Sequence, residues 1–188
     1  MGLDAAASSF RTPGAHVLRP FVARDRRGDF CKVFDIEVFA RHGLETRFEE
    51  TFVTTSARDV IRGMHLQLPP HDHVKCVTCL RGRILDVIVD LREGSPMVGQ
   101  HESIELAGSD PRTVYVPPGV AHGFCVLEGP AIVHYATSTR HAPSHDTGIR
   151  WDTFGMRWPV TQPIVSERDA ALPTLAEFRS PFRFEGPR

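Results

Sequence analysis

Residues 75–91 read KCVTCLRGRILDVIVDL. The runs Lys75–Leu80 and Arg83–Leu91 are rich in Val, Ile, Leu and Cys, which is typical of buried β-strands. Between them, Arg81-Gly82 has the composition of a tight turn. The stretch therefore predicts two antiparallel strands joined by a short turn.

The same pattern continues on both sides of this stretch. Short apolar runs are separated by Gly- and Pro-rich breaks at Val17–Val22, Phe30–Phe34, Phe48–Thr54, Gln100–Leu106, Thr113–Val116, Gly123–Val126 and Ile132–Thr137. Helical patterns are confined to about Ile36–His42 and the tail around Ala170–Phe178. Many short strands with few helices predict an all-β antiparallel barrel or sandwich.

The length and charge of the chain limit the classes of function. A chain of 188 residues fits one domain, and we expect a flexible N-terminal arm over residues 1–15 and a single domain over 16–188. Lys and Arg number 22 against 23 Asp and Glu, so no net field favours nucleic acid or a membrane surface as a partner. Neither a signal peptide nor a long apolar span is present, which predicts a cytoplasmic protein.

Four cysteines occur, and only two are close in sequence. Cys76 and Cys79 form a C-x-x-C inside an apolar run, where a strand interior is a better interpretation than a redox centre or zinc site. We expect all four to be reduced and the C-x-x-C pair to belong to the core.

The densest polar stretch lies at residues 62–75. Arg62, His65, Gln67, His73 and Lys75 alternate there with apolar residues. In a strand, His65 and Gln67 share one face, and so do His73 and Lys75. A solvated sheet face would show the same alternation. A pocket is favoured by His122 and Tyr135, which are polar residues in apolar runs, and by the carboxylate of Asp169 near the end of the chain.

Two chemistries fit these residues. His71, His73 and His122 resemble the imidazole ligands of metal-binding cupin barrels, but Lys75 follows where that pattern expects a Glu, and a cation beside a divalent ion is unfavourable. Alternatively, His65 acts as a base oriented by Asp169. Lys75 would then stabilise an enolate, and Tyr135 would exchange a proton on the opposite face. This second set suits proton abstraction next to a ketone.

From about Phe21 to Phe182 the chain resembles the sugar-nucleotide epimerases of the dTDP-4-dehydrorhamnose 3,5-epimerase family. The resemblance rests on six motifs in family order: Asp25–Phe30, Val60–Gln67, Lys75 with Leu80-Arg81-Gly82, Asp86–Arg92 with Gly94-Ser95-Pro96, Pro117–Phe124 and Pro163–Asp169.

The resemblance implies a double-stranded β-helix, that is, a cupin-type jelly-roll barrel with a few short helices mainly near the C-terminus. It also implies a homodimer without cofactor or metal that inverts C3 and C5 of an NDP-4-keto-6-deoxyhexose in deoxysugar biosynthesis. The implied catalytic residues are His65, Asp169, Lys75 and Tyr135. The implied substrate-binding residues are Arg62, Arg27, His122, Gln67 and Phe30, and Asp86 is expected to orient Lys75.

Some positions depart from the family pattern, and they leave the substrate open. Lys32 stands where a Glu is common, Glu50 and Phe52 replace a polar Gln and Asn pair, and His73 replaces a Gln. The nucleotide could be dTDP, CDP or GDP, and the enzyme could invert C3 alone. Three further functions compatible with such a barrel are a metal-dependent cupin enzyme, a 3,4-ketoisomerase and a non-catalytic sugar-nucleotide-binding module.

Overall fold

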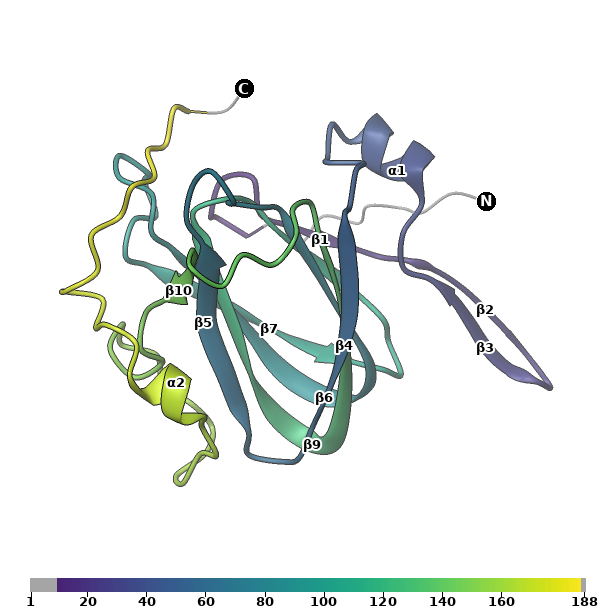
Figure 1. Ribbon diagram of the computed structural model, residues 1–188. Coiled ribbons are helices and arrows are strands. Elements are labelled where there is room, and N and C mark those ends of the chain that lie inside the picture. Colours follow the sequence, from purple (N-terminus) through teal and green to yellow (C-terminus); the bar gives the residue numbers. More distant parts are fainter. Residues whose placement is uncertain (1–9, 187–188) are drawn as a thin grey trace.

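The computed structural model describes residues 10–186 and consists mainly of β-strands. The strands are β1 (His16–Leu18), β2 (Phe21–Asp25), β3 (Gly28–Lys32), β4 (Glu50–Ser56), β5 (Ile61–Gln67), β6 (Lys75–Asp90), β7 (His101–Ala107), β8 (Thr113–Val116), β9 (Val120–Thr137) and β10 (Asp146–Gly148) (Figure 1). The helices are α1 (Ile36–Arg41) and α2 (Glu167–Ala170). Within the described residues, no helix is both long and apolar enough to cross a membrane.

The two longest strands, β6 and β9, organise the barrel. They pair antiparallel from Lys75 opposite Thr137 to Asp90 opposite Val120. The first part of β6 also pairs with β8 and its second part with β7, while the first part of β9 pairs with β5 and its second part with β4. The two strands therefore pass through two sheet halves, β7-β6-β9-β5-β10 and β1-β8-β6-β9-β4. Two facing halves that share long strands form the jelly-roll barrel that the family resemblance implies.

Apolar side chains fill three layers. The central cluster lies between the halves and includes Val77, Ile84, Ile88, Phe124 and Val133, all fully buried. Alternate residues of the same strands face outward. On one side they meet the C-terminal segment through Phe154, Phe178 and Phe182, and on the other they meet α1 through Phe39. Figure 1 shows α1 and the C-terminal segment on opposite sides of the barrel.

The sequence predicts that strands end at Arg81-Gly82 and at Glu128–Pro130, and both predictions are wrong. β6 continues through Arg81-Gly82, and β9 continues through Glu128–Pro130, with shifts in the pairing register between Cys79 and Ile84. Gly82 has a φ of +75°, and a Cβ there would lie 2.4 Å from the carbonyl oxygen of Glu128. A glycine that permits a left-handed residue and a close backbone approach makes a bulge within a strand, so the strand bends without ending.

The two predicted helices have different outcomes. α1 is confirmed, and the Asp35 side chain caps it by accepting a hydrogen bond from the Glu37 backbone N–H. The tail does not form one helix over 170–178, because α2 ends at Ala170 and Pro173 follows. A separate turn starts at Thr174, whose backbone N–H and hydroxyl bind the Glu177 carboxylate.

Part of the predicted N-terminal arm lies in the structure. Residues 1–9 are outside the described residues, whereas Thr12 is buried and donates from its backbone and hydroxyl to Glu102. Ala15 belongs to the central cluster. All four cysteines are free, and Cys76 and Cys79 are buried in the core, as the sequence predicts.

Candidate active site

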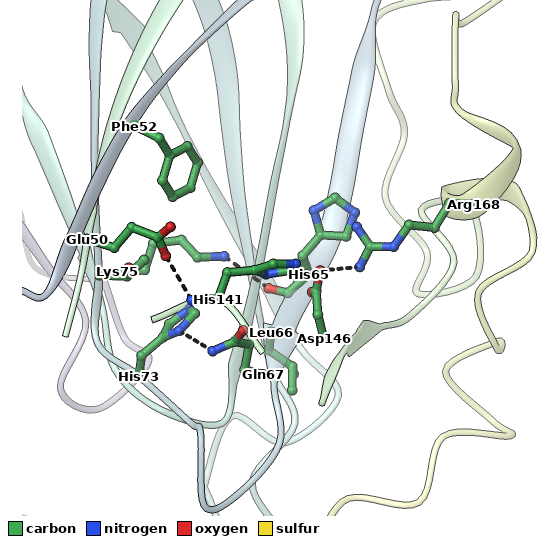
Figure 2. A pocket seen from close by; sticks show the side chains of 11 residues that line it. Glu50, Phe52, His65, Leu66, Gln67, His73, Lys75, His141, Asp146 and Arg168 are labelled. Carbon is green, nitrogen blue, oxygen red and sulfur yellow. Dashed lines mark hydrogen bonds and ion pairs between the residues drawn. The ribbon is translucent and has the colours of Figure 1, made fainter. Parts of the chain in front are cut away.

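A pocket opens between β4, β5, β6 and β9. Its larger cavity, of about 350 Å³, is lined by Glu50, Phe52, His65, Leu66, Gln67, His73, Lys75, Thr137, His141, Asp146 and Arg168. A smaller cavity, of about 150 Å³, is lined by Phe52, Thr54, Arg62, His65, Lys75, His122, Phe124 and Tyr135. Phe52, His65 and Lys75 line both, so the two cavities are adjoining parts of one pocket. Figure 2 shows the larger cavity.

His65 and Asp169 form the predicted imidazole–carboxylate pair. His65 Nε2 lies 2.7 Å from Asp169 Oδ1, and the Asp169 side chain is almost entirely buried. Burial alone would raise the pKa of Asp169, but the hydrogen bond and charge of His65, the Gly63 N–H and the charge of Arg168 together lower it. An ionised carboxylate accepts the hydrogen from Nε2, and the neutral ring then carries its lone pair on Nδ1. This tautomer leaves Nδ1 as the basic nitrogen.

The end of the chain reaches His65 through backbone hydrogen bonds to the start of β5. Ile61 N–H donates to the Ile164 carbonyl, and Ile164 N–H donates to the Asp59 carbonyl. Two residues later, the Ser166 hydroxyl caps α2 by accepting from the Asp169 N–H. The first turn of α2 thus presents the Asp169 carboxylate to β5.

Gly63 brings three elements together at this point. Its N–H donates to the second carboxylate oxygen of Asp169 at 3.1 Å. Its φ is +130°, and a Cβ would lie 2.5 Å from the Cα of Gly123 on β9. Only glycine allows β5 to approach β9 this closely while its N–H faces Asp169.

Lys75 faces the same space as His65, as predicted. Its ammonium group lies 3.4 Å from the His65 carbonyl oxygen. Burial lowers the pKa of Lys75 to about 8, and the charges of Asp146 and Asp86 oppose this shift. The amine is therefore a cation at neutral pH but loses its charge in mildly alkaline solution.

Asp86 does not orient Lys75 by a hydrogen bond, contrary to the prediction. Its Oδ2 lies 2.7 Å from His122 Nε2, and both side chains are fully buried. Burial lowers the pKa of His122 against the opposing charge of Asp86. Asp86 acts on Lys75 only through its charge, because its position on β6 opposite Phe124 brings its carboxylate to the imidazole of β9.

Tyr135 and Arg62 complete the smaller cavity. Tyr135 is 6% exposed, and burial raises the pKa of its hydroxyl, so the phenol stays protonated at neutral pH. Arg62 donates from Nε to the Ser56 hydroxyl at 2.9 Å. A cationic guanidinium beside the cavity is suited to an anionic group such as a phosphate.

Gln67 lines the larger cavity, but both polar atoms of its side chain form hydrogen bonds within the protein. Its amide nitrogen donates to the His71 and Arg140 carbonyls, and its oxygen accepts from the Ala142 N–H at 2.6 Å. These bonds join β5 to the two loops beside the cavity. The structure therefore supports a positioning role for Gln67 where the sequence predicts substrate binding.

Arg27 and Phe30 lie away from the pocket within one chain. They sit on the β2–β3 hairpin, a separate two-stranded sheet that projects from the barrel (Figure 1). Arg27 pairs with Asp25 at 2.6 Å, and Phe30 is 56% exposed. Their place in the site is predicted only by the family motif that contains them. The sequence does not reveal that the hairpin projects away from the barrel.

The three imidazoles of the predicted metal site are not brought together. His122 binds Asp86, His71 packs against His145, and His73 receives a hydrogen bond from Gln67 on Nδ1. Burial, with the charges of Lys75 and His141, lowers the pKa of His73 to about 3. In residues 10–186 no group of three or more His, Cys, Asp or Glu side chains is arranged to hold a metal ion.

Sequence reasoning missed His141, Asp146 and Arg168 in the larger cavity, and it singled out Glu50 only as a departure from the family pattern. Arg168 pairs with Asp146 at 2.8 Å, and Glu50 accepts from the His141 N–H at 2.8 Å. Arg168 adjoins Asp169 in a recognised motif and could have been inferred from it. His141 and Asp146 carry no such signal, because their loop reaches the cavity only through tertiary contacts.

The family model described as dTDP-4-dehydrorhamnose 3,5-epimerase matches residues 9–177. The chain belongs to this family. The member from Mycolicibacterium smegmatis, a dTDP-4-dehydrorhamnose 3,5-epimerase, is 38% identical over 168 residues, which are 87% of this chain and 83% of that protein.

Solved structures of the epimerase family also superpose on this chain. The dTDP-4-dehydrorhamnose 3,5-epimerase from Bacillus anthracis, with TDP and PPi bound, has a TM-score of 0.87 and 34% identity, over 92% of this chain and 99% of that one. A 3′-monoepimerase from Streptomyces bikiniensis, in complex with dTDP-quinovose, has a TM-score of 0.85 and 31% identity, over 89% and 86% of the chains. Two relatives of similar identity and TM-score thus have different names, one a 3,5-epimerase and the other a 3′-monoepimerase.

Replacing Gln67 with Ala tests its positioning role. The variant leaves the Ala142 N–H and the Arg140 carbonyl without the Gln67 partner, whereas the Thr139 hydroxyl still donates to the His71 carbonyl. We expect the free energy of unfolding to fall by about 1–3 kcal/mol. Hydrogen exchange at the Ala142 amide should accelerate, whereas His141→Ala, which changes another residue of the same cavity, should leave that amide protected. If hydrogen exchange at the Ala142 amide is unchanged in Gln67→Ala while the KM for the substrate rises, Gln67 belongs to substrate binding instead.

Proposed function

We propose that this protein inverts C3 and then C5 of a nucleotide-diphosphate 4-keto-6-deoxyhexose in deoxysugar biosynthesis. The observation that carries the proposal is the His65–Asp169 pair facing the Lys75 ammonium group in one pocket. Epimerase family membership supports the reaction class. The relative from Bacillus anthracis binds TDP, which supports a nucleotide-sugar substrate.

Proton removal at C3 starts the reaction. The C3 proton moves to His65 Nδ1, and the electrons of the C–H bond form a C3–C4 double bond while the charge moves to O4. Asp169 stabilises the imidazolium, and the Lys75 ammonium stabilises the enolate oxygen as its charge develops. Water returns a proton to the opposite face of C3, which restores the ketone and inverts this centre.

The second inversion uses Tyr135. The same cycle at C5 sends the C5 proton to the imidazole, and the protonated phenol of Tyr135 supplies a proton to the other face. Burial keeps this phenol protonated, which suits it to the role of acid. Solvent removes the proton from the histidine after each of the two proton abstractions, and it restores the proton to the tyrosine between turnovers.

Charged residues of the pocket suit a nucleotide diphosphate. The smaller cavity, with His65, Lys75, His122 and Tyr135, takes the sugar, and Arg62 stabilises the diphosphate. The larger cavity then receives the nucleoside beside Glu50 and His73. Since these two residues depart from the family pattern, dTDP, CDP and GDP all remain candidates for the nucleotide.

A homodimer gives Arg27 and Phe30 a role that one chain cannot. The β2–β3 hairpin projects from the barrel and exposes two aromatic residues, Phe21 and Phe30, at 37% and 56%. In this proposal the hairpin of one subunit packs on the other subunit and brings both residues to its pocket. The free cysteines fit a cytoplasmic enzyme, where thiols stay reduced.

Solvent deuterium tests the proposed reaction. Incubation with dTDP-, CDP- and GDP-4-keto-6-deoxyhexoses in deuterated water should place deuterium at C3 and C5 of the accepted substrate, read by mass spectrometry and NMR. The preferred nucleotide is read from the same experiment. Absence of deuterium at both carbons with all three substrates would refute the proposed epimerase activity.

His65→Asn in the same assay should reduce exchange about 10²–10⁴-fold, because the general base is lost. The matched control is His134→Asn, since His134 adjoins Tyr135 on β9 and projects from the opposite face of the strand. Near-normal exchange in His65→Asn would remove His65 from the role of base.

The pKa of Lys75 predicts the alkaline side of the pH profile. As the pH rises through about 8, Lys75 loses the positive charge that stabilises the enolate, so kcat/KM should fall. Lys75→Arg keeps a cation at all accessible pH values and should lose this alkaline decline even if it is slower. A wild-type kcat/KM that stays constant well above pH 8 would contradict the role of Lys75.

A further inference from the structure

Phe52 lies against the proposed acid of the reaction. β4 and β9 pair so that Phe52 is directly opposite Tyr135. Their rings are stacked, with centroids 4.7 Å apart and planes within 13°. Tyr135 is 6% exposed, whereas Phe52 is 42% exposed, so the more exposed Phe52 ring covers one face of the buried phenol ring.

A second ring holds Tyr135 from another direction. The imidazole of His122 meets the Tyr135 ring edge-on, at 6.3 Å and 76°. His122 is itself fixed by Asp86. Stacking on Phe52 and an edge contact with His122 restrict the tyrosine to one orientation, since aromatic pairs of this geometry are attractive beyond their buried area.

Phe52 also stands where the two cavities adjoin. It lines both cavities, together with His65 and Lys75. Figure 2 shows its ring reaching from β4 above Lys75, apart from the polar groups around Asp146 and Arg168. Its contact with Tyr135 therefore lies where the two cavities meet.

We infer that Phe52 is a positioning residue that holds Tyr135 in the orientation needed for proton transfer at C5. This inference rests on the proposed function and extends it to a residue that departs from the family pattern. The C3 step uses His65, Asp169 and Lys75, and no hydrogen bond or ion pair joins Phe52 to them. Loss of the Phe52 ring should therefore affect the second carbon more than the first.

The test compares deuterium at C5 with deuterium at C3 in the wild type, Phe52→Leu and Phe52→Tyr. Leu keeps an apolar side chain of related volume but cannot stack, and the ratio of C5 to C3 deuterium should fall about three- to tenfold. Tyr keeps the stacked ring, and the ratio should stay at the wild-type value. Circular dichroism checks that each variant is folded. We expect both variants to fold, because Phe52 is partly exposed.

Each outcome is informative. An equal loss at C3 and C5 in Phe52→Leu would show that Phe52 only shapes the pocket, which overturns the inference. Wild-type exchange at C3 alone would also overturn it, while leaving a C3 epimerase in place. No wild-type exchange at either carbon would refute the proposed function itself and the inference with it.

Discussion

The 2.7 Å contact between His65 Nε2 and Asp169 Oδ1 joins residues 104 positions apart, and the pocket depends on it. Three separate features make the contact. Backbone bonds to Ile164 fasten the tail to the start of β5, the Ser166 cap starts α2, and the glycine at 63 turns its N–H toward the carboxylate. The carboxylate fixes the tautomer of the imidazole and stabilises the cation that forms when a proton is taken. A single strand face becomes a reactive centre only because the tail folds back over it.

The strand pattern and the polar residues could be predicted from sequence because both depend on local information. Alternation placed His65 and Gln67 on one face, and short apolar runs identified most strands, although not β5 or β10. Where strands end was harder to predict, since Gly82 bends β6 at a bulge without ending it. In the tail, one helix was predicted around residues 170–178, but α2 ends at Ala170 and Pro173 follows. A local pattern does not distinguish a bend inside a strand from a turn between two strands.

Roles that depend on tertiary partners were harder to infer than the residues themselves. Asp86 was expected beside Lys75 but binds His122, since the register of β6 against β9 decides which side chain it meets. Gln67 lies in the pocket as expected, yet loop carbonyls and an N–H occupy its amide. Arg27 lies on a hairpin that leaves the barrel. The nearly balanced charge of the chain also conceals a pocket that contains local pairs of basic and acidic side chains, His65 with Asp169 and Arg168 with Asp146.

A double-mutant cycle at His65 and Asp169 tests the central claim most directly. If the carboxylate acts through the imidazole, the kcat of His65→Asn/Asp169→Asn equals that of His65→Asn alone, because Asp169 has nothing left to orient. Losses that multiply, so that the double variant is slower than His65→Asn by the full factor of Asp169→Asn, would show that the two residues act independently and would contradict the account.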